Sequence, residues 1–197
     1  MQTDSIAVIL LAAGASIRLG EPKQLLQFQG ETLLRRSVKT ALAVSNKVVV
    51  TLGANFKLFQ KEIEDLPIEI AENKNWKHGM SSSIKCGLER IFAGGENLQA
   101  VILMLCDQPF ADEKLLDEII SVYKKTNSLI VSSEYQNTLG VPALFDRKLF
   151  SELLKLDAQT GAKQLIKKYC PQTTAVSFPK GAFDVDTPTD YVKLITS

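Results

Sequence analysis

The sequence predicts an α/β fold in which helices cover both faces of a mostly parallel sheet. Short apolar or β-branched runs alternate with stretches of helical periodicity, a pattern typical of β–α–β units. Residues 6–11 and 100–105 are apolar at every position, as expected for strands that are buried on both faces. No repeat, linker or low-complexity segment interrupts the pattern, so we expect a single domain over residues 1–197.

Strands are predicted where apolar and β-branched residues cluster, at residues 6–11, 47–52, 68–71, 100–105, 129–132 and 141–145, with short extended pieces at 173–178 and 182–185. Helices are predicted where apolar residues recur every three or four positions, at residues 32–44, 56–66, 81–92, 148–154 and 161–169. Asp112 is expected to cap a further helix. Thr187, followed by Pro188 and then Asp190, is expected to begin a terminal helix.

The composition is that of an ordinary soluble protein, with 45% hydrophobic and 23% charged residues. A net charge of +1 gives no support to nucleic-acid or membrane-surface binding, so any basic site must be local. Three separated cysteines without a C-x-x-C pair, and no predicted signal peptide, favour a reducing cytoplasm. With one histidine a zinc site is disfavoured, and any metal is expected to be a hard cation on carboxylates. We expect a monomer.

The residues that follow the first strand predict a phosphate-binding loop. Small residues from Ala12 to Ala15 let the backbone approach a bulky anion, and successive N–H groups can point at its oxygens. Arg18 and Lys23 add positive charge to the same loop. The P-loop pattern is absent, because it has four residues between its glycines and here five separate Gly14 from Gly20. The G-x-G-x-x-G pattern is absent as well. A plain strand-to-loop turn remains the alternative.

This loop resembles the opening motif of the MobA-like nucleotidyltransferases, and within that group the molybdenum cofactor cytidylyltransferases. The resemblance is carried by Leu11, Ala12, Ala13, Gly14, Ser16, Arg18, Leu19, Gly20 and Lys23. It implies a three-layer α/β/α Rossmann-like nucleotidyltransferase fold that binds a nucleoside triphosphate. Cytidylyl members usually have alanine where Ala13 stands, whereas guanylyl members have glycine, which leaves room for a purine.

Three acidic residues are candidate metal ligands. Asp107 ends the apolar run 100–105, where an ionised carboxylate needs a partner such as Mg²⁺ or a hydrogen bond to the following turn. Asp184 and Asp186 are two apart in an extended segment and point the same way. The alternative role for Asp186 is to favour the terminal helix dipole. The resemblance implies that Asp107 and one acid of the second pair, Asp186 before Asp184, hold catalytic Mg²⁺.

Three consecutive serines at residues 81–83 open a predicted helix and offer hydroxyl and free N–H groups. Simple helix capping is the alternative, and we expect Trp76 to pack and His78 to lie at the surface. Together with the resemblance, the predicted nucleotide-binding residues are Leu11, Ala12, Ala13, Gly14, Ala15, Ser16, Arg18, Lys23, Gly79, Ser81, Ser82 and Asp107. Arg18, Lys23 and Asp107 are the predicted catalytic residues.

Residues 140–145 and 157–163 resemble segments that border the acceptor in the family. Val141 replaces the usual histidine, and residues 158–160 alter the second segment, which puts the acceptor in doubt. The resemblance implies transfer of CMP from CTP to the phosphate of molybdopterin, with release of pyrophosphate. A molybdenum-enzyme client is a possible further partner. A relative that uses another base or a sugar phosphate, and a non-catalytic cofactor-delivery chaperone, are the two alternatives. The retained charges on Arg18, Lys23, Asp107 and Asp186 favour catalysis.

Overall fold

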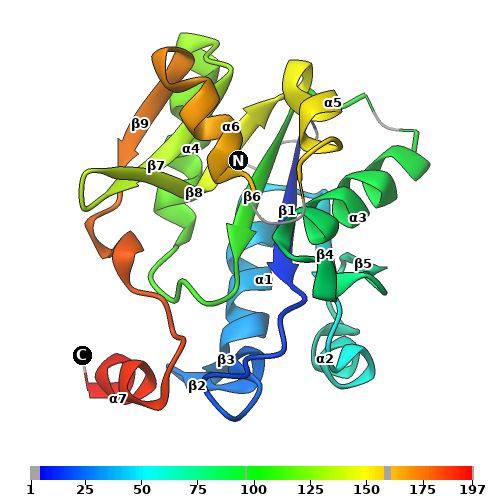
Figure 1. Cartoon of the computed structure of the whole chain (residues 1–197), viewed down its shortest axis with the longest axis vertical. Coiled ribbons are helices and arrows are strands. Elements are labelled where there is room, and N and C mark those ends of the chain that lie inside the picture. Colours follow the sequence, from blue (N-terminus) through cyan, green and yellow to red (C-terminus); the bar gives the residue numbers. More distant parts are fainter. Residues whose placement is uncertain (1–4, 96, 158–160, 197) are drawn as a thin grey trace.

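The computed structural model of the chain describes residues 5–95, 97–157 and 161–196. A seven-stranded sheet in the order β5-β4-β1-β6-β8-β7-β9 forms the middle of three layers (Figure 1). Its strands are β1 (Ile6–Ala12), β4 (Val48–Leu52), β5 (Glu69–Glu72), β6 (Ala100–Leu105), β7 (Ile130–Tyr135), β8 (Thr138–Asp146) and β9 (Thr173–Ser177). Within this sheet β8 runs antiparallel to both neighbours, and the other pairs are parallel. The predicted α/β class and mostly parallel sheet are therefore confirmed.

Helices cover both faces of the sheet. On one face lie α1 (Leu33–Val44), α2 (Phe56–Ile63) and α4 (Glu113–Thr126). On the other face lie α3 (Met80–Ala93), α5 (Phe150–Leu153) and α6 (Lys163–Lys168). The C-terminal helix α7 (Pro188–Thr196) lies apart from the sheet, beside the small hairpin of β2 (Gln27–Phe28) and β3 (Glu31–Thr32) (Figure 1).

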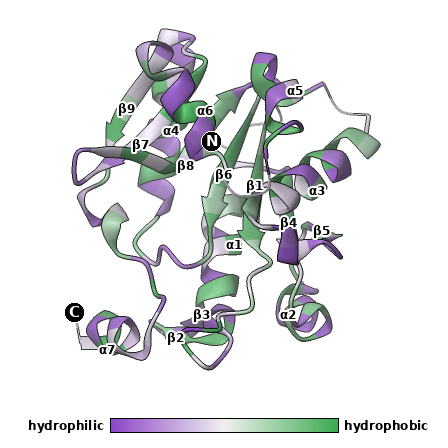
Figure 2. Ribbon diagram, viewed as in Figure 1, coloured by the Kyte–Doolittle hydropathy of each residue, from purple (hydrophilic) through white to green (hydrophobic). Residues whose placement is uncertain are grey.

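The core explains why β1 is apolar at every position. Ile6, Val8 and Leu10 pack into the cluster on the α1 face, whereas Ala7 and Ile9 pack into the cluster on the α3 face. Successive side chains of a strand point to opposite faces, so a strand that is covered on both sides has no polar face. The hydropathy colouring shows this in β1 and β6, which are both green (Figure 2).

Side chains cap three helices, and the caps at Asp112 and Thr187 were predicted. Thr32 accepts a hydrogen bond from the backbone of Arg35 at the start of α1, and Asp112 accepts one from Leu115 at the start of α4. The Thr187 hydroxyl donates to Asp190, while the backbone N–H of Thr187 donates to the same carboxylate. These contacts satisfy orphan donors at the helix ends, as a capping box does.

Two local expectations need correction. The extended piece predicted at residues 182–185 joins no strand, because Ala182 ends the short 3₁₀ helix Pro179–Ala182 and Phe183 leads into a loop. The β2–β3 hairpin was not predicted. Its turn consists of Gln29 and Gly30, both with positive φ, which matches a two-residue hairpin turn.

The topology places a switch point at the carboxyl ends of β1 and β6. From β1 the chain proceeds through α1 to β4 and β5 on one side, then returns through α3 to β6 on the other side of β1. Ligands of open α/β sheets bind at such a switch point. No helix among the described residues is long and apolar enough to cross a membrane.

Candidate active site

The candidate site lies where β1 and β6 end side by side. The two strands are in parallel register, with Leu11 opposite Leu105. The loop after β1 and Asp107, two residues beyond β6, therefore emerge next to each other at one edge of the sheet. This is the arrangement that their positions after two apolar strands predicted.

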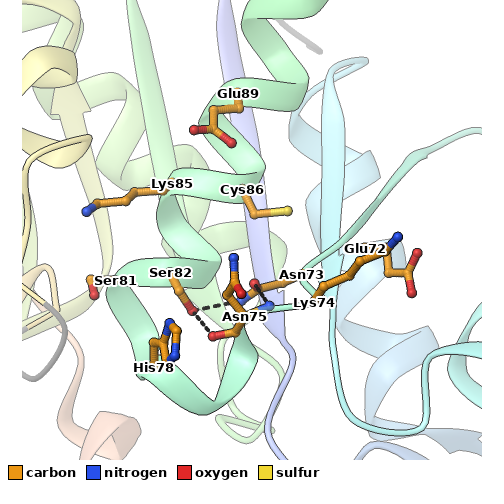
Figure 3. Close-up of a pocket in the computed structure, with 10 residues that line it drawn as sticks. All are labelled: Glu72, Asn73, Lys74, Asn75, His78, Ser81, Ser82, Lys85, Cys86 and Glu89. Carbon is orange, nitrogen blue, oxygen red and sulfur yellow. Dashed lines mark hydrogen bonds between the residues drawn. The ribbon is translucent and has the colours of Figure 1, made fainter.

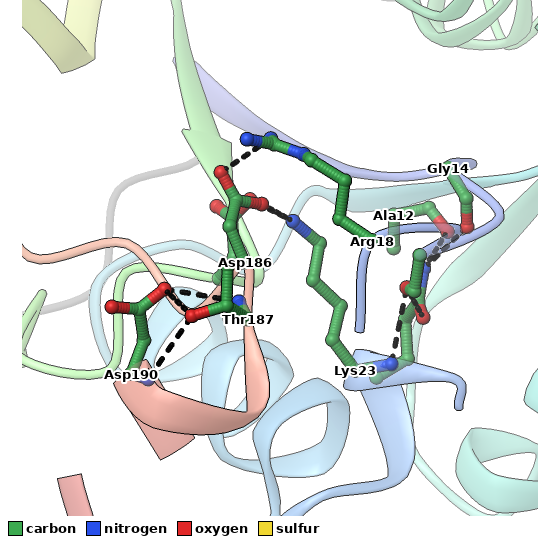
Figure 4. A network of polar contacts seen from close by, with 10 residues as sticks. Ala12, Gly14, Arg18, Lys23, Asp186, Thr187 and Asp190 are labelled. Atoms are coloured by element: carbon green, nitrogen blue, oxygen red, sulfur yellow. Dashed lines mark hydrogen bonds and ion pairs between the residues drawn. The ribbon is translucent and has the colours of Figure 1, made fainter. Parts of the chain in front are cut away.

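Four charged side chains from three parts of the chain meet at this edge, and Figure 4 labels three of them, Arg18, Lys23 and Asp186. The Lys23 Nζ lies 2.5 Å from Oδ2 of Asp107 and 2.9 Å from Oδ1 of Asp186. The guanidinium of Arg18 lies 2.6 Å from Oδ2 of Asp186. The lysine and Asp107 side chains are mostly buried, whereas Arg18 is 72% exposed and open to a ligand from solvent.

The charges shift one another's pKa values. Burial alone would lower the pKa of Lys23, but the Asp107 and Asp186 carboxylates raise it above its ordinary value. Burial alone would raise the pKa of Asp186, but Lys23 and Arg18 lower it. Loss of water around Asp184, together with its neighbours Asp107 and Asp186, raises the pKa of Asp184 to about 6. The edge thus holds a fixed lysine cation between the side chains of Asp107 and Asp186.

The C-terminal segment around Asp186 is held at the site by contacts on either side of that residue. The backbone N–H of Val185 donates to the carbonyl of Asp107 at 3.0 Å, and the Val185 side chain is fully buried. Leu194 of α7 packs into the same small cluster, which also holds Leu26 and Phe28 beside the hairpin. Asp186 lies between these two attachments, so its carboxylate is held against Lys23.

A buried glutamine, which the sequence analysis did not single out, organises the loop. Gln24 is 1% exposed and lies in the 3₁₀ turn Lys23–Leu25. Its side-chain amide donates to the carbonyls of Ala12 and Gly14, and its Oε1 accepts from the hydroxyl of Ser16. A polar residue inside a polar loop produces no hydropathy pattern, and the only available signal is its position next to Lys23.

Two adjoining pockets flank the ion pairs. One, of about 360 Å³, is lined by Leu11, Ala12, Ala13, Gly14, Lys23, Gln24, Trp76, Lys77, Gly79, Met80, Ser83, Leu105, Cys106 and Asp107. The other, of about 370 Å³, is lined by Gly14, Ala15, Ser16, Ile17, Arg18, Lys23, Trp76 and Asp186. They share Gly14, Lys23 and Trp76, so a ligand of two parts can extend from one into the other. We call them the inner pocket and the outer pocket.

Trp76 forms part of the wall of both pockets, and it also packs against the backbone at Gly53. A Cβ atom on Gly53 would lie 2.5 Å from Cβ of Trp76, so only glycine allows this close approach. The expected packing role is therefore present. Gly79, with a φ of +93°, begins α3 beside the inner pocket, where a residue with a side chain would be strained.

The structure does not bring Ser81 and Ser82 to the inner pocket. They line a separate pocket of about 550 Å³ on the outer side of α3, together with His78, Lys85 and Glu89 (Figure 3). The Ser82 hydroxyl donates to the carbonyls of Asn75 and Gly79 and is held within its own turn. Ser83 is the serine that lines the inner pocket, because successive helical residues point about 100° apart.

The segments expected near the acceptor contribute no described residue to the lining of either pocket. Val141 is in β8 and is partly buried against the α3-face core. A Cβ on Gly161 would lie 3.2 Å from the Sδ of Met80, so this segment approaches the pocket wall. Residues 158–160 lie outside the described residues.

The acidic residues fit a hard divalent cation. The Oδ1 of Asp107 is buried and has no hydrogen-bond partner, which leaves an acceptor available to a cation. Among the described residues no three His, Cys, Asp or Glu side chains form a ready cage. Two carboxylates completed by phosphate oxygens and water are the coordination that Mg²⁺ uses in nucleotide sites.

The fold and the site define a protein that binds a phosphate-bearing ligand at the switch point of an α/β sheet. The model of the MobA-like NTP transferase domain matches residues 8–174, and the chain belongs to this family.

Two curated relatives show the range of the family. The chain is 37% identical over 103 residues to nicotine blue oxidoreductase of Paenarthrobacter nicotinovorans, a match that covers 51% of this chain and 48% of that protein, about half its length. It is 21% identical over 189 residues to molybdenum cofactor cytidylyltransferase of Escherichia coli strain K12, covering 95% and 94% of the two chains.

Solved structures agree over nearly the whole chain. The crystal structure of Rv0371c from Mycobacterium tuberculosis H37Rv has a TM-score of 0.85 at 28% identity, covering 98% of this chain and 99% of that one. Rv0371c in complex with manganese has a TM-score of 0.77 at 27% identity, again covering 98% and 99%. The nucleotidyltransferase fold is therefore confirmed, and a family member binds a divalent metal.

Proposed function

We propose that this chain transfers CMP from CTP to the phosphate of molybdopterin and releases pyrophosphate. The observation that carries the proposal is the contact of Lys23 with both Asp107 and Asp186 beside the two adjoining pockets. It brings a cation from the first loop together with acids from two distant segments. The full-length match to a cytidylyltransferase supports the choice of reaction.

The nucleotide is proposed to occupy both pockets. The nucleoside would lie in the inner pocket, against Ala13 and the start of α3, and the triphosphate would extend into the outer pocket. The methyl group of Ala13 takes up room that a purine would need, which favours CTP over GTP. Arg18 and Lys23 would neutralise the charge on the β- and γ-phosphates as pyrophosphate departs.

The reaction requires little acid–base help from the protein. An oxygen of the acceptor phosphate forms a bond to the α-phosphorus of CTP while the bond from that phosphorus to the bridging oxygen of pyrophosphate breaks. The acceptor phosphate is already ionised near neutral pH, so no strong base has to remove a proton. Catalysis by this chain then consists of aligning the two phosphates and neutralising their charge.

Asp107 and Asp186 are the residues proposed to hold Mg²⁺, with Asp184 as second choice. When bound, the metal would supply charge stabilisation for the phosphate oxygens of donor and acceptor. The orphaned Oδ1 of Asp107 supports this assignment. Lys23 occupies the space between the two acids and would turn from the carboxylates to the phosphates.

The test is pyrophosphate release by the purified protein, measured with each nucleoside triphosphate and with molybdopterin or a sugar phosphate as acceptor. Release that requires both CTP and molybdopterin supports the proposal. Release with another base or acceptor identifies a different transferase of the family. Tight nucleotide binding without turnover on any acceptor would instead indicate a cofactor-delivery protein.

A further inference from the structure

The loop after β1 has carbonyl groups that are hydrogen-bonded within the protein, whereas several of its backbone amides have no acceptor among the described residues. The carbonyls of Ala12 and Gly14 accept from Gln24, and that of Ala13 accepts from the backbone of Ala54. Within the described ranges, no intramolecular acceptor is found for the backbone N–H groups of residues 14–18, which border the outer pocket. An unpaired row of amides beside a cavity is suited to bind an anion.

Gln24 accounts for two of these inward carbonyls. Its Nε2 lies 2.9 Å from the carbonyl oxygen of Gly14 and 3.2 Å from that of Ala12. Its Oε1 accepts from the Ser16 hydroxyl, which in turn accepts from the backbone N–H of Lys23 at 3.1 Å. Ser16 has a φ of +54°, a conformation that is costly without such support. The buried side-chain amide of Gln24 thus connects three loop positions with one another and, through the Ser16 hydroxyl, with the backbone of Lys23.

We propose that Gln24 is a positioning residue for the triphosphate, which turns the loop amides and the backbone of Lys23 toward the phosphates without touching the nucleotide itself. The proposal rests on the nucleotide site of the proposed function. It assigns the recognition of phosphate, and not of the nucleoside, to this side chain. Removal of the Gln24 side chain should therefore weaken the binding of a ligand more, the more phosphate groups the ligand carries.

Trp76 provides a direct readout, because it is the single tryptophan of the chain and lines both pockets. Binding of cytidine, CMP, CTP and inorganic tripolyphosphate would be followed by its fluorescence in the wild type and in Gln24→Met, which keeps the side-chain length but loses both hydrogen-bonding functions. Gln27→Met is the matched control, since Gln27 is exposed in β2 three residues away. Ser16→Ala is a second variant, in a more exposed position, that breaks the same connection to Lys23.

We expect Gln24→Met to weaken the binding of CTP and tripolyphosphate by at least about tenfold, and the binding of cytidine by less than about twofold. Ser16→Ala should show the same order of effects, and Gln27→Met should match the wild type. Equal losses for cytidine and CTP would indicate a merely structural role and overturn the proposal, as would unchanged CTP binding in both variants. A wild-type protein that binds no phosphate-bearing ligand would refute the nucleotide site as well. Normal binding with no pyrophosphate release would refute the proposed reaction alone.

Discussion

Lys23 and Asp107 form a mostly buried ion pair with 2.5 Å between Nζ and Oδ2, and the same ammonium lies 2.9 Å from Asp186. A lysine therefore occupies the position between the two acids to which we assign a metal ion. Because the two cations would share carboxylate oxygens, they compete. A bound triphosphate offers the lysine other partners, so we expect metal and nucleotide to favour each other's binding.

Replacement of Lys23 by methionine should change metal and nucleotide affinity in opposite directions. Without the ammonium, Asp107 and Asp186 repel each other and attract a free dication, so Mn²⁺ alone should bind about tenfold more tightly or better. CTP should bind more weakly because a phosphate contact is lost. Electron paramagnetic resonance of Mn²⁺ measures the first effect and Trp76 fluorescence the second. Lys39→Met, which removes an exposed cation on α1 paired with Glu31, is the control. Weaker Mn²⁺ binding in Lys23→Met would contradict the competition.

The variant Asp107→Asn should lose turnover while keeping its fold. The amide retains the shape of the side chain but carries no negative charge to attract a dication, and it leaves Lys23 with one acid partner. Pyrophosphate release and the circular dichroism spectrum would be measured together. Asp117→Asn, an exposed change on α4, should behave like the wild type. Wild-type turnover in Asp107→Asn would eliminate the metal role of Asp107.

Arg18→Ala should reduce kcat/KM by about 30-fold to 1,000-fold, because loss of one donor to a developing oxyanion costs about 2–4 kcal/mol. The side chain is exposed and pairs with Asp186 alone among the described ion pairs, so the free energy of unfolding should barely change. Arg90→Ala removes another exposed arginine, one that pairs with Glu69, and serves as control. An unchanged kcat/KM would remove Arg18 from the set of catalytic residues.

Leu194→Ala should loosen the segment that carries Asp186. Leu194 is 1% exposed in the cluster beneath α7, and such a truncation costs about 2–5 kcal/mol where the site cannot collapse. The Val185 amide, which donates to Asp107, should then exchange its hydrogen faster, and turnover should fall. Ile195→Ala, at a neighbouring position that is 55% exposed, should affect neither measurement. Slow exchange at Val185 in the Leu194 variant would show that α7 does not fix this segment.

The pair between Arg35 and Asp65 should give stability that depends on acid pH. The arginine hydrogen bonds hold the pKa of Asp65 at about 2, below its ordinary value of 3.8. The folded state therefore releases this proton more readily than the unfolded state, and the stabilisation is complete above about pH 4 and lost as pH falls through 2. Urea unfolding of Asp65→Asn should differ from the wild type at pH 7 and converge with it at pH 2. Glu64→Gln, at the adjacent exposed position, should show no such convergence.

Much of the site could be predicted because two of its strands are apolar at every position in the sequence. The apolar runs of β1 and β6 leave no amphipathic alternative, and residues that follow parallel strands meet at one edge, which brings Lys23 and Asp107 together. The capping residue Asp112 could also be predicted, since the start of a helix requires an acceptor for its free backbone N–H groups. The contact with Asp186 followed from the family resemblance, because the residues alone left its role open.

Other features depend on contacts that sequence patterns do not record. Three adjacent serines look alike in the sequence, and only the rotation of α3 decides that Ser83 faces the inner pocket. The role of Gln24 depends on burial within a loop, for which no periodicity exists. Residues 182–185 were predicted as a short extended piece, but the sheet ends at β9, and the backbone N–H of Val185 instead donates to the carbonyl of Asp107.

The reversed strand β8 has a consequence for how such a protein can diversify. β7 and β8 meet in the two-residue turn of Gln136 and Asn137, both with positive φ, at the same edge of the sheet as Asp107. That part of the rim is therefore a ribbon that folds back on itself, independent of the loop that follows β1. Its tip can lengthen or change composition during evolution while the loop after β1 stays intact. Grafting this ribbon between relatives would accordingly change this part of the rim and leave the loop after β1 unaltered.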